Sequence, residues 1–190
     1  MRSQGLRLNP RVPLPPGRYQ LRIGVRESGA GEMGSVFYDL DVPDFSASGV
    51  SLSGVLLTAT SARLQPTFQP DPTVSALPGP ATSRREFARG DTLNLFAEVY
   101  DNVPQKEQHR VEVATTLLSE SGREVFRSTQ PLAANSANNG KNSTFTYATT
   151  LPLADVEAGR YLLRVEAAAR GSGNVNGIQN SVRETLITIK

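Results

Sequence analysis

The chain has 190 residues, of which 38% are hydrophobic and 20% are charged, and its formal net charge is +2. This length is sufficient for one sizeable hydrophobic core, and so small a net charge does not by itself indicate nucleic-acid binding. The sequence has no cysteine and a single histidine, His109, which excludes a disulfide framework, a thiolate or histidine-based zinc site, and a catalytic triad with a choice of histidine bases.

The N-terminal residues 1–19 are rich in arginine and proline and have no apolar stretch of the kind found in signal peptides. Nowhere does the sequence have about 18 consecutive apolar residues, so we expect no transmembrane segment. Any export signal would then lie upstream, on a longer parent chain.

Residues 18–26 and 36–42 predict the first two strands, because apolar and polar side chains alternate with a period of two. We expect the polar face to carry three arginines and two aspartates that form cross-strand ion pairs in solvent. The apolar face of this predicted hairpin is formed by Tyr19, Leu21, Ile23, Val36, Tyr38 and Leu40.

The loop between these two strands contains Gly29-Ala-Gly31-Glu-Met-Gly34, which fits the GxGxxG pattern of dinucleotide-binding proteins. That pattern requires a helix after the glycines, whose N-terminus holds the pyrophosphate. Here the alternating stretch 36–42 follows and ends at Pro43, which leaves no room for a βαβ unit. We therefore interpret the glycines as a turn and predict no cofactor.

Residues 44–48 match the DxSxS pattern of metal-ion-dependent adhesion sites. Hard cations need several convergent oxygen ligands, and the stretch leads directly into another apparent strand, so we interpret it as a linker and predict no metal.

The rest of the chain predicts an all-β fold with further strands at 51–60, 91–101, 109–119, 123–129 and 143–151. The stretch 64–89 has five prolines; because proline donates no ladder hydrogen bond, we expect an insertion there that is either a long loop or a segment running along the sheet edge. Arg89-Gly90-Asp91 is interpreted as a turn before a strand, not as an adhesion tripeptide. Asn142-Ser-Thr144 fits a glycosylation sequon in a surface loop.

An internal repeat organises the chain: Gly17, Arg18, Tyr19, Leu21 and Arg22 recur 142 residues later as Gly159, Arg160, Tyr161, Leu163 and Arg164. In each copy the tyrosine follows a turn, as at the corner before strand F of immunoglobulin-like domains. We predict structural corner roles for Tyr19 and Tyr161 and no catalytic residue. The final strand has two candidate inward faces, Val182/Leu186 or Ile187/Ile189.

The predicted fold is thus an immunoglobulin-like antiparallel β-sandwich of about seven strands, formed by residues 46–190 with an insertion at 64–89. Residues 1–45 are predicted to be the C-terminal hairpin of a truncated domain of the same kind. If so, the apolar face of the hairpin should be incompletely covered.

The stretch from Leu14 to Thr58, and above all "PGRYQLRIGVRE", "GSVFYDLDVPDF" and "LSGVLLT", resembles the C-terminal region of acidobacterial von Willebrand factor A-related proteins. The resemblance implies an exported protein, periplasmic or secreted, whose A domain and metal site lie outside this chain. We expect a non-catalytic structural or protein-interaction module that contacts a protein partner or neighbouring domains of a longer chain. The alternative is a ligand-binding module, for example for carbohydrate, that uses end loops. The sequence does not indicate an oligomeric state.

Overall fold

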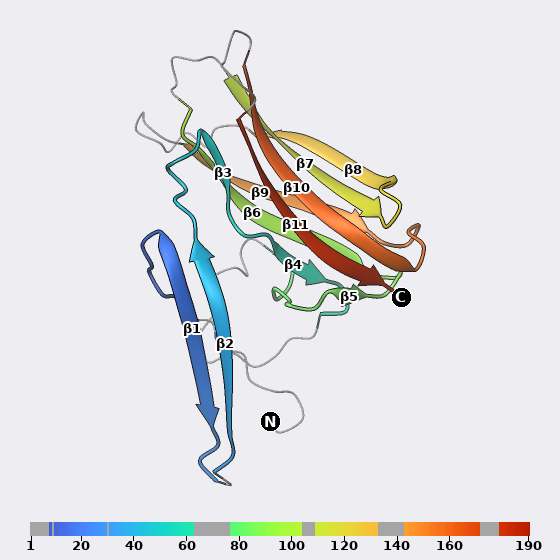
Figure 1. Cartoon of the computed structure of the whole chain (residues 1–190). Coiled ribbons are helices and arrows are strands. Elements are labelled where there is room, and N and C mark those ends of the chain that lie inside the picture. The colour runs from blue at the N-terminus through green and yellow to red at the C-terminus, as the bar shows by residue number, and fades with distance from the viewer. Residues whose placement is uncertain are drawn as a thin grey trace.

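Figure 1 shows the computed structural model of the chain, which describes residues 8, 10–29, 31–62, 77–103, 109–132, 143–171 and 179–190. All regular structure in these ranges is β-strand, as predicted. The strands are β1 (Gly17–Arg26), β2 (Met33–Val42), β3 (Val50–Leu52), β4 (Leu56–Ala59), β5 (Glu86–Phe87), β6 (Thr92–Asp101), β7 (His109–Ser119), β8 (Glu124–Leu132), β9 (Ser143–Pro152), β10 (Gly159–Gly171) and β11 (Gln179–Ile189).

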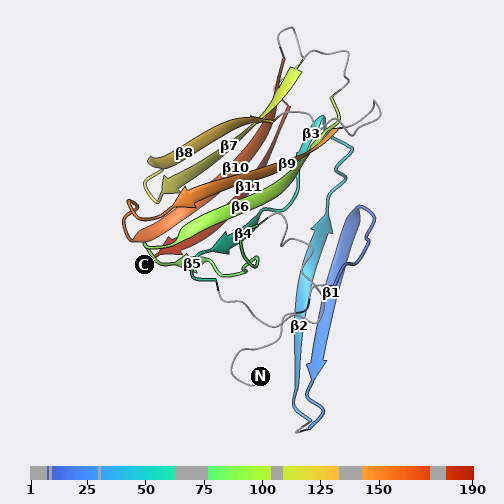
Figure 2. The ribbon, with the colours of Figure 1, turned by 180° about the vertical axis from the view of Figure 1, so that it is seen from behind.

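Two sheets form a sandwich, which confirms the predicted fold class (Figures 1 and 2). One sheet has the order β5-β11-β10-β7-β8; in the other, β6 pairs with β3 and β4 along one edge and with β9 along the other. This arrangement corresponds to the A-B-E and C-F-G sheets of immunoglobulin-like domains, with β10 in the place of strand F. Except for the parallel β5–β11 pair, the described pairings are antiparallel.

The core lies between the two sheets and follows directly from the alternation in the sequence. Odd-numbered apolar residues of β6, β9, β10 and β11 point inward, and burying each large one contributes about 1.5–3 kcal/mol. On β11 the inward face is Ile187/Ile189, which are 2% and 1% exposed, whereas Leu186 is 57% exposed. The buried side chains of these strands include Leu93, Leu95, Val99, Phe145, Tyr147, Leu151, Tyr161, Leu163 and Val165.

The strand expected at 51–60 is interrupted, so this prediction was wrong in detail. Leu52 pairs with Val99 and Leu56 with Phe96, which leaves three residues of this segment opposite two of β6. Such a bulge breaks the ladder and bends the strand, and Gly54 lies at its centre. The Ser53 hydroxyl oxygen accepts a hydrogen bond from the Glu98 amide at 2.9 Å and so occupies the gap.

The end of the proline-rich insertion 64–89 runs along a sheet edge, as one of the two alternatives predicted. Residues 63–76 lie outside the described ranges, but the end of the insertion forms β5, which runs parallel to β11. The Thr188 and Lys190 amides donate to the Arg85 and Phe87 carbonyls at 2.7 and 2.9 Å. A two-residue strand has no periodicity, so the sequence offered no signal for it.

The β1–β2 hairpin is a separate two-stranded sheet that projects from the sandwich (Figures 1 and 2). Neither of its strands pairs with a described strand of the sandwich. Within the described ranges, the chain has no helix that is long and apolar enough to cross a membrane.

Candidate interaction surfaces

The apolar face of the hairpin is the most exposed hydrophobic surface of the described chain. Cross-strand pairs Tyr19–Leu40, Leu21–Tyr38 and Ile23–Val36 place all six predicted residues on one face. Tyr19 and Leu40 are half-buried and the other four are 40–62% exposed. Of the ten exposed large hydrophobic side chains in the described residues, seven belong to the hairpin. Leu21, Ile23, Val25, Val36 and Tyr38 lie on this face, whereas Met33 and Phe37 lie on the opposite face.

The opposite face of the hairpin carries the arginines, but the predicted ion pairs do not form. Arg18 lies directly opposite Asp41, yet no described arginine of this face is within ion-pair distance of Asp39 or Asp41. The Asp39 carboxylate instead accepts a hydrogen bond from the side-chain nitrogen Nε2 of Gln20 at 3.2 Å. The Arg22 guanidinium lies 5.5 Å from the centre of the Phe37 ring, within cation–π range.

Tyr19 and Tyr161 occupy equivalent places at the start of β1 and β10. The Tyr19 hydroxyl donates to the Pro15 carbonyl at 2.9 Å, and the Tyr161 hydroxyl donates to the Glu157 carbonyl at 2.7 Å. Each bond spans four residues, and each ring lies against the glycine two residues before it. This is the geometry that a corner role requires, because the bond ties the incoming turn to the first residues of the strand.

The first two glycines of the GxGxxG pattern lie in the turn that connects β1 to β2. The Glu27 amide donates to the Glu32 carbonyl at 2.8 Å, and Gly31 has a φ of +74°, a conformation that favours glycine. Strand β2 begins at Met33, where a nucleotide site would need a helix. The corresponding loop after β10, residues 172–178, lies outside the described ranges.

The junction between hairpin and sandwich uses the DxSxS segment as a folded linker. Asp44 accepts hydrogen bonds from the Ser46 amide and hydroxyl at 2.9 and 2.6 Å, and these bonds lower the pKa of its carboxyl group. Its oxygens are thus used in a local turn, and no group of three potential metal ligands occurs among the described residues. The Phe45 ring packs on Tyr100 of β6 at a centroid distance of 4.9 Å.

Asn102 ties this linker to the sandwich. Its side-chain nitrogen donates to the Phe45 and Ser48 carbonyls at 2.7 and 2.8 Å, and its amide donates to the Gly49 carbonyl at 2.7 Å. These bonds hold the point from which the hairpin projects.

Substituting Asn102 is therefore expected to loosen the hairpin without unfolding the sandwich. In Asn102→Ala the two side-chain bonds are lost, and backbone order parameters of residues 44–49 should fall from about 0.85 to below about 0.6 in ¹⁵N relaxation measurements. Asn102→Asp keeps the shape but has no N–H to donate, so it should act in the same way. Unchanged order parameters in both variants would show that Phe45 packing and the backbone hydrogen bond from Asn102 to Gly49 fix the junction without the two side-chain bonds.

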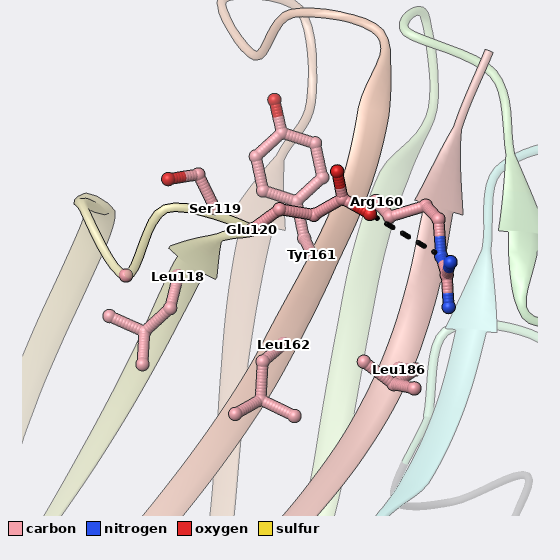
Figure 3. A pocket seen from close by; sticks show the side chains of 8 residues that line it. Leu118, Ser119, Glu120, Arg160, Tyr161, Leu162 and Leu186 are labelled. Atoms are coloured by element: carbon pink, nitrogen blue, oxygen red, sulfur yellow. Dashed lines mark ion pairs between the residues drawn. The ribbon is translucent and has the colours of Figure 1, made fainter.

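A second exposed surface lies on the outer face of the β7–β10–β11 sheet (Figure 3). Leu118, Leu162 and Leu186 are directly opposite one another across the three strands, and we call them the leucine row. They line an open pocket of about 360 Å³, together with Ser119, Glu120, Gly122, Arg160 and Tyr161. The Arg160 Nε lies 3.7 Å from the Glu120 carboxylate, and both side chains are exposed.

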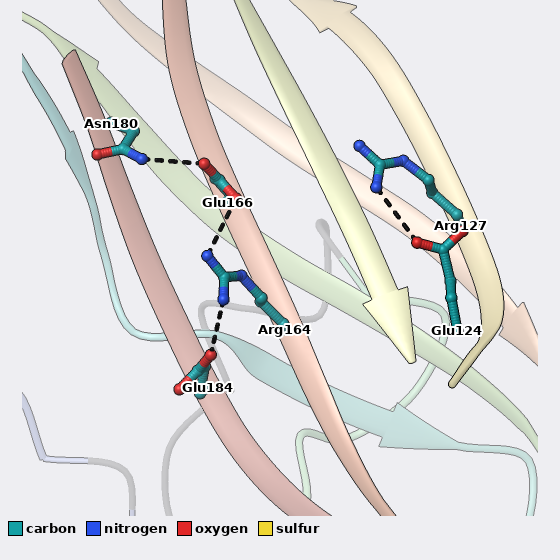
Figure 4. A network of polar contacts seen from close by, with 6 residues as sticks. All are labelled: Glu124, Arg127, Arg164, Glu166, Asn180 and Glu184. Carbon is teal, nitrogen blue, oxygen red and sulfur yellow. Dashed lines mark hydrogen bonds and ion pairs between the residues drawn. The ribbon is translucent and has the colours of Figure 1, made fainter. Parts of the chain in front are cut away.

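A polar network borders the leucine row on the same face (Figure 4). Arg164 bridges Glu166 and Glu184, with both distances 3.3 Å, and Asn180 donates to Glu166 at 3.0 Å. Exposed ion pairs of this kind contribute little to stability. The leucine row was not predicted from the sequence, in which Leu186 was a candidate for the inward face of the last strand.

Asp91, the last residue of the adhesion-like tripeptide, is buried at 4% exposure and cannot contact an external receptor. Its carboxylate accepts hydrogen bonds from the Thr60 hydroxyl, the Ser61 amide and hydroxyl, and the Ala88 amide at 2.9–3.0 Å. Burial raises the pKa of this carboxyl group, but the four donors together outweigh burial and lower it. The turn interpretation is thus confirmed, with a structural role that the sequence did not indicate.

The only histidine is also engaged. The His109 Nε2 lies 2.9 Å from the Asp101 carboxylate, and both side chains are nearly buried where β6 ends and β7 begins. Asp101 also accepts a hydrogen bond from the Val103 amide at 3.1 Å. The pair links the last residue of β6 to the first residue of β7. Asn142 of the predicted sequon lies outside the described residues.

No model of a known protein family matches this sequence, and no curated protein matches it. Nine chains of solved structures match. One of them is the crystal structure of the C-terminal domain of Wzt, which is 8% identical, covers 76% of this chain and 75% of that chain, and has a TM-score of 0.49. At this level the likeness carries no argument about function.

Proposed function

We propose that the chain is a non-catalytic structural and protein-interaction module, in which the sandwich is the scaffold and the β1–β2 hairpin is the contact element. One observation supports this most strongly: the exposed large hydrophobic side chains concentrate on the hairpin. A contiguous exposed apolar surface on a soluble protein usually marks a site of protein interaction.

The physics of a two-stranded sheet supports the same proposal. An isolated hairpin is at best marginally stable in water, and it needs a third strand or a packed face to gain stability. Strands β1 and β2 each have ten residues, yet in the described chain they pair only with each other. A partner that covers the apolar face would supply the missing burial.

Three carboxylates and the histidine side chain form hydrogen bonds within the chain itself, which supports the non-catalytic part of the proposal. Asp91 binds four donors of its own chain, Asp44 caps a turn, and Asp101 pairs with His109. The pocket beside the leucine row has one exposed ion pair and a predominantly apolar lining. An exported location, periplasmic or secreted, and an origin in a longer bacterial protein are proposed from the family resemblance alone.

Site-specific photo-crosslinking in producing cells tests the interaction role. A photo-reactive residue is placed at Val36 on the hairpin, at Leu186 in the leucine row, or at Arg127 on β8 as the control position. We expect a discrete protein adduct at position 36 and none at position 127. Equal labelling at all three positions, or no adduct at any, would contradict an interaction module.

The ligand-binding alternative stays a prediction, because the loops 104–108, 133–142 and 172–178 lie outside the described residues. Electrophoresis in polysaccharide-containing gels separates the two functions. Carbohydrate binding would be favoured over protein interaction if two results are found together. The chain would be retarded in the gel even when hairpin residues such as Val36 are substituted, and no crosslinked adduct would form at position 36.

A further inference from the structure

The β1–β2 and β10–β11 hairpins are built from the same sequence element in the same register. Gly17 and Tyr19 pair with Val42 and Leu40, as Gly159 and Tyr161 pair with Ile189 and Ile187. Together with the equivalent tyrosine hydrogen bonds, this assigns β1 to the place of β10 and β2 to the place of β11.

The second copy shows what surrounds this element in a complete domain. The edge of β10 that faces away from β11 pairs antiparallel with β7 along eleven residues, from Tyr161–Ser119 to Gly171–His109. Its inner face is buried in the sandwich core, so that Leu163 and Val165 are each 1% exposed. Their counterparts Leu21 and Ile23 are 40% and 48% exposed, and β1 has no described strand on its second edge.

We propose that a protein partner completes the hairpin as a second immunoglobulin-like sandwich, by adding an antiparallel strand to the outer edge of β1 and covering its apolar face. This inference rests on the proposed interaction role and specifies the partner. Strand addition to an open edge supplies main-chain hydrogen bonds, and alternate side chains supply specificity. The partner strand therefore carries apolar residues at every second position.

The arginines define the other face of the partner strand. Arg18 corresponds to Arg160, whose guanidinium lies 3.7 Å from Glu120, just beyond β7. Arg26 corresponds to Ala168, which lies opposite Glu112. A partner strand with carboxylates at the positions of Glu112 and Glu120 would bring one carboxylate to each end of β1. Among the described residues, Arg18 and Arg26 have no ion pair of their own. Opposite charges across neighbouring strands are favourable.

The same charges disfavour a second copy of this chain as the partner. If the β1 edges of two copies paired antiparallel with both apolar faces on one side, the other side would carry six arginines, three from each copy. Pairing of two β2 edges gathers Asp39 and Asp41 from both copies in the same way. Pairing β1 with β2 of another copy matches the charges but leaves an open edge at each end, so that it predicts filaments and not a closed complex.

The natural absence of cysteine allows a clean test by disulfide exchange. The probe is a synthetic peptide of residues 109–120, the strand seen on the edge of β10, with Thr115→Cys. The full-length chain carries Ile23→Cys, the counterpart of Val165, which pairs with Thr115. Arg127→Cys on the edge strand β8 is the matched control. The mixed disulfide is quantified at equilibrium in a glutathione buffer.

The Ile23→Cys chain should form the mixed disulfide at least about tenfold more favourably than the Arg127→Cys chain, because strand addition raises the effective concentration of the thiols. A peptide with Glu112→Lys and Glu120→Lys should lose about three- to fivefold for each reversed pair. Equal equilibrium constants at both chain positions, or no effect of charge reversal, would overturn strand addition. The interaction role would still stand if the adduct at Val36 forms in cells.

Sedimentation velocity of the unmodified chain is the companion measurement. We expect a monomer from about 1 to 100 μM, concentrations at which a specific homodimer would assemble. Closed dimers would overturn the charge argument, and concentration-dependent filaments would assign the open edge to another copy of the chain.

Discussion

Asp91→Ala is expected to lower the free energy of unfolding by about 3–5 kcal/mol, because it removes a buried carboxylate that accepts four hydrogen bonds. The Thr60 and Ser61 hydroxyls lie on the turn after β4, and the Ala88 amide lies just after β5. Asp91 therefore joins its own turn after β5 to the turn after β4, which lies 30 residues earlier in the sequence. Urea unfolding followed by far-UV circular dichroism measures the loss.

The same carboxylate predicts an acid-sensitive contribution to stability. Its pKa is lower in the folded protein than the ordinary aspartate value of 3.8, so the unfolded chain binds the proton more readily. The contribution is complete well above 3.8 and is lost as the pH falls through that value toward the folded pKa. The difference in unfolding free energy between wild type and Asp91→Asn should accordingly be constant from about pH 7 to 5 and shrink below about pH 4.

Asp44 provides a matched control for this experiment. Its pKa is also lowered by hydrogen bonds, but its carboxyl group is exposed and its donors belong to one local turn. Asp44→Ala should therefore change the urea midpoint far less than Asp91→Ala. Equal losses in the two variants would show that the hydrogen bonds of Asp91 have no special role in holding the two turns together.

The long strands were predictable because each keeps strict alternation against a buried face. Residues 92–101 alternate between half-buried and buried without exception, and residues 143–152 do nearly the same. The interruption of 51–60 was not predictable, since a bulge depends on the register with β6, which only the folded sheet defines. β5 escaped prediction because two residues carry no period. The burial of Asp91 was not predictable because three of its four donors belong to Thr60 and Ser61, which lie 31 and 30 residues away in the sequence.

The candidate surfaces were predictable to different degrees. The repeat led to an uncovered apolar face on the hairpin, and four of its six named residues are exposed by 40% or more. The predicted Arg–Asp ion pairs were wrong, although the register places Arg18 opposite Asp41. Long exposed side chains lose conformational entropy when they pair, and water competes for both charges. The leucine row needs three strands in register, which the sequence alone did not provide.

The two repeat copies provide a matched pair of substitutions at Leu163 and Leu21. Leu163→Ala should lower the free energy of unfolding by about 2–5 kcal/mol, because it leaves a cavity between two packed sheets. Leu21→Ala should cost less than about 1 kcal/mol, since the side chain is 40% exposed and the face around it is open. Both residues occupy the same position of the same motif, so local strand propensity cancels in the comparison.

Chemical denaturation of both variants, followed with the same optical probe, measures the difference between their losses of unfolding free energy. We expect this difference to arise because a second sheet covers Leu163 and not Leu21. In Leu163→Ala the neighbours Tyr161 and Val165 stay buried around the lost side chain, whereas the neighbours of Leu21 already contact solvent. If Leu21→Ala proves as costly as Leu163→Ala in the isolated chain, then residues of this chain already cover the face. The hairpin would in that case have no surface left for a partner, and the strand-addition proposal would fail together with the open-face description.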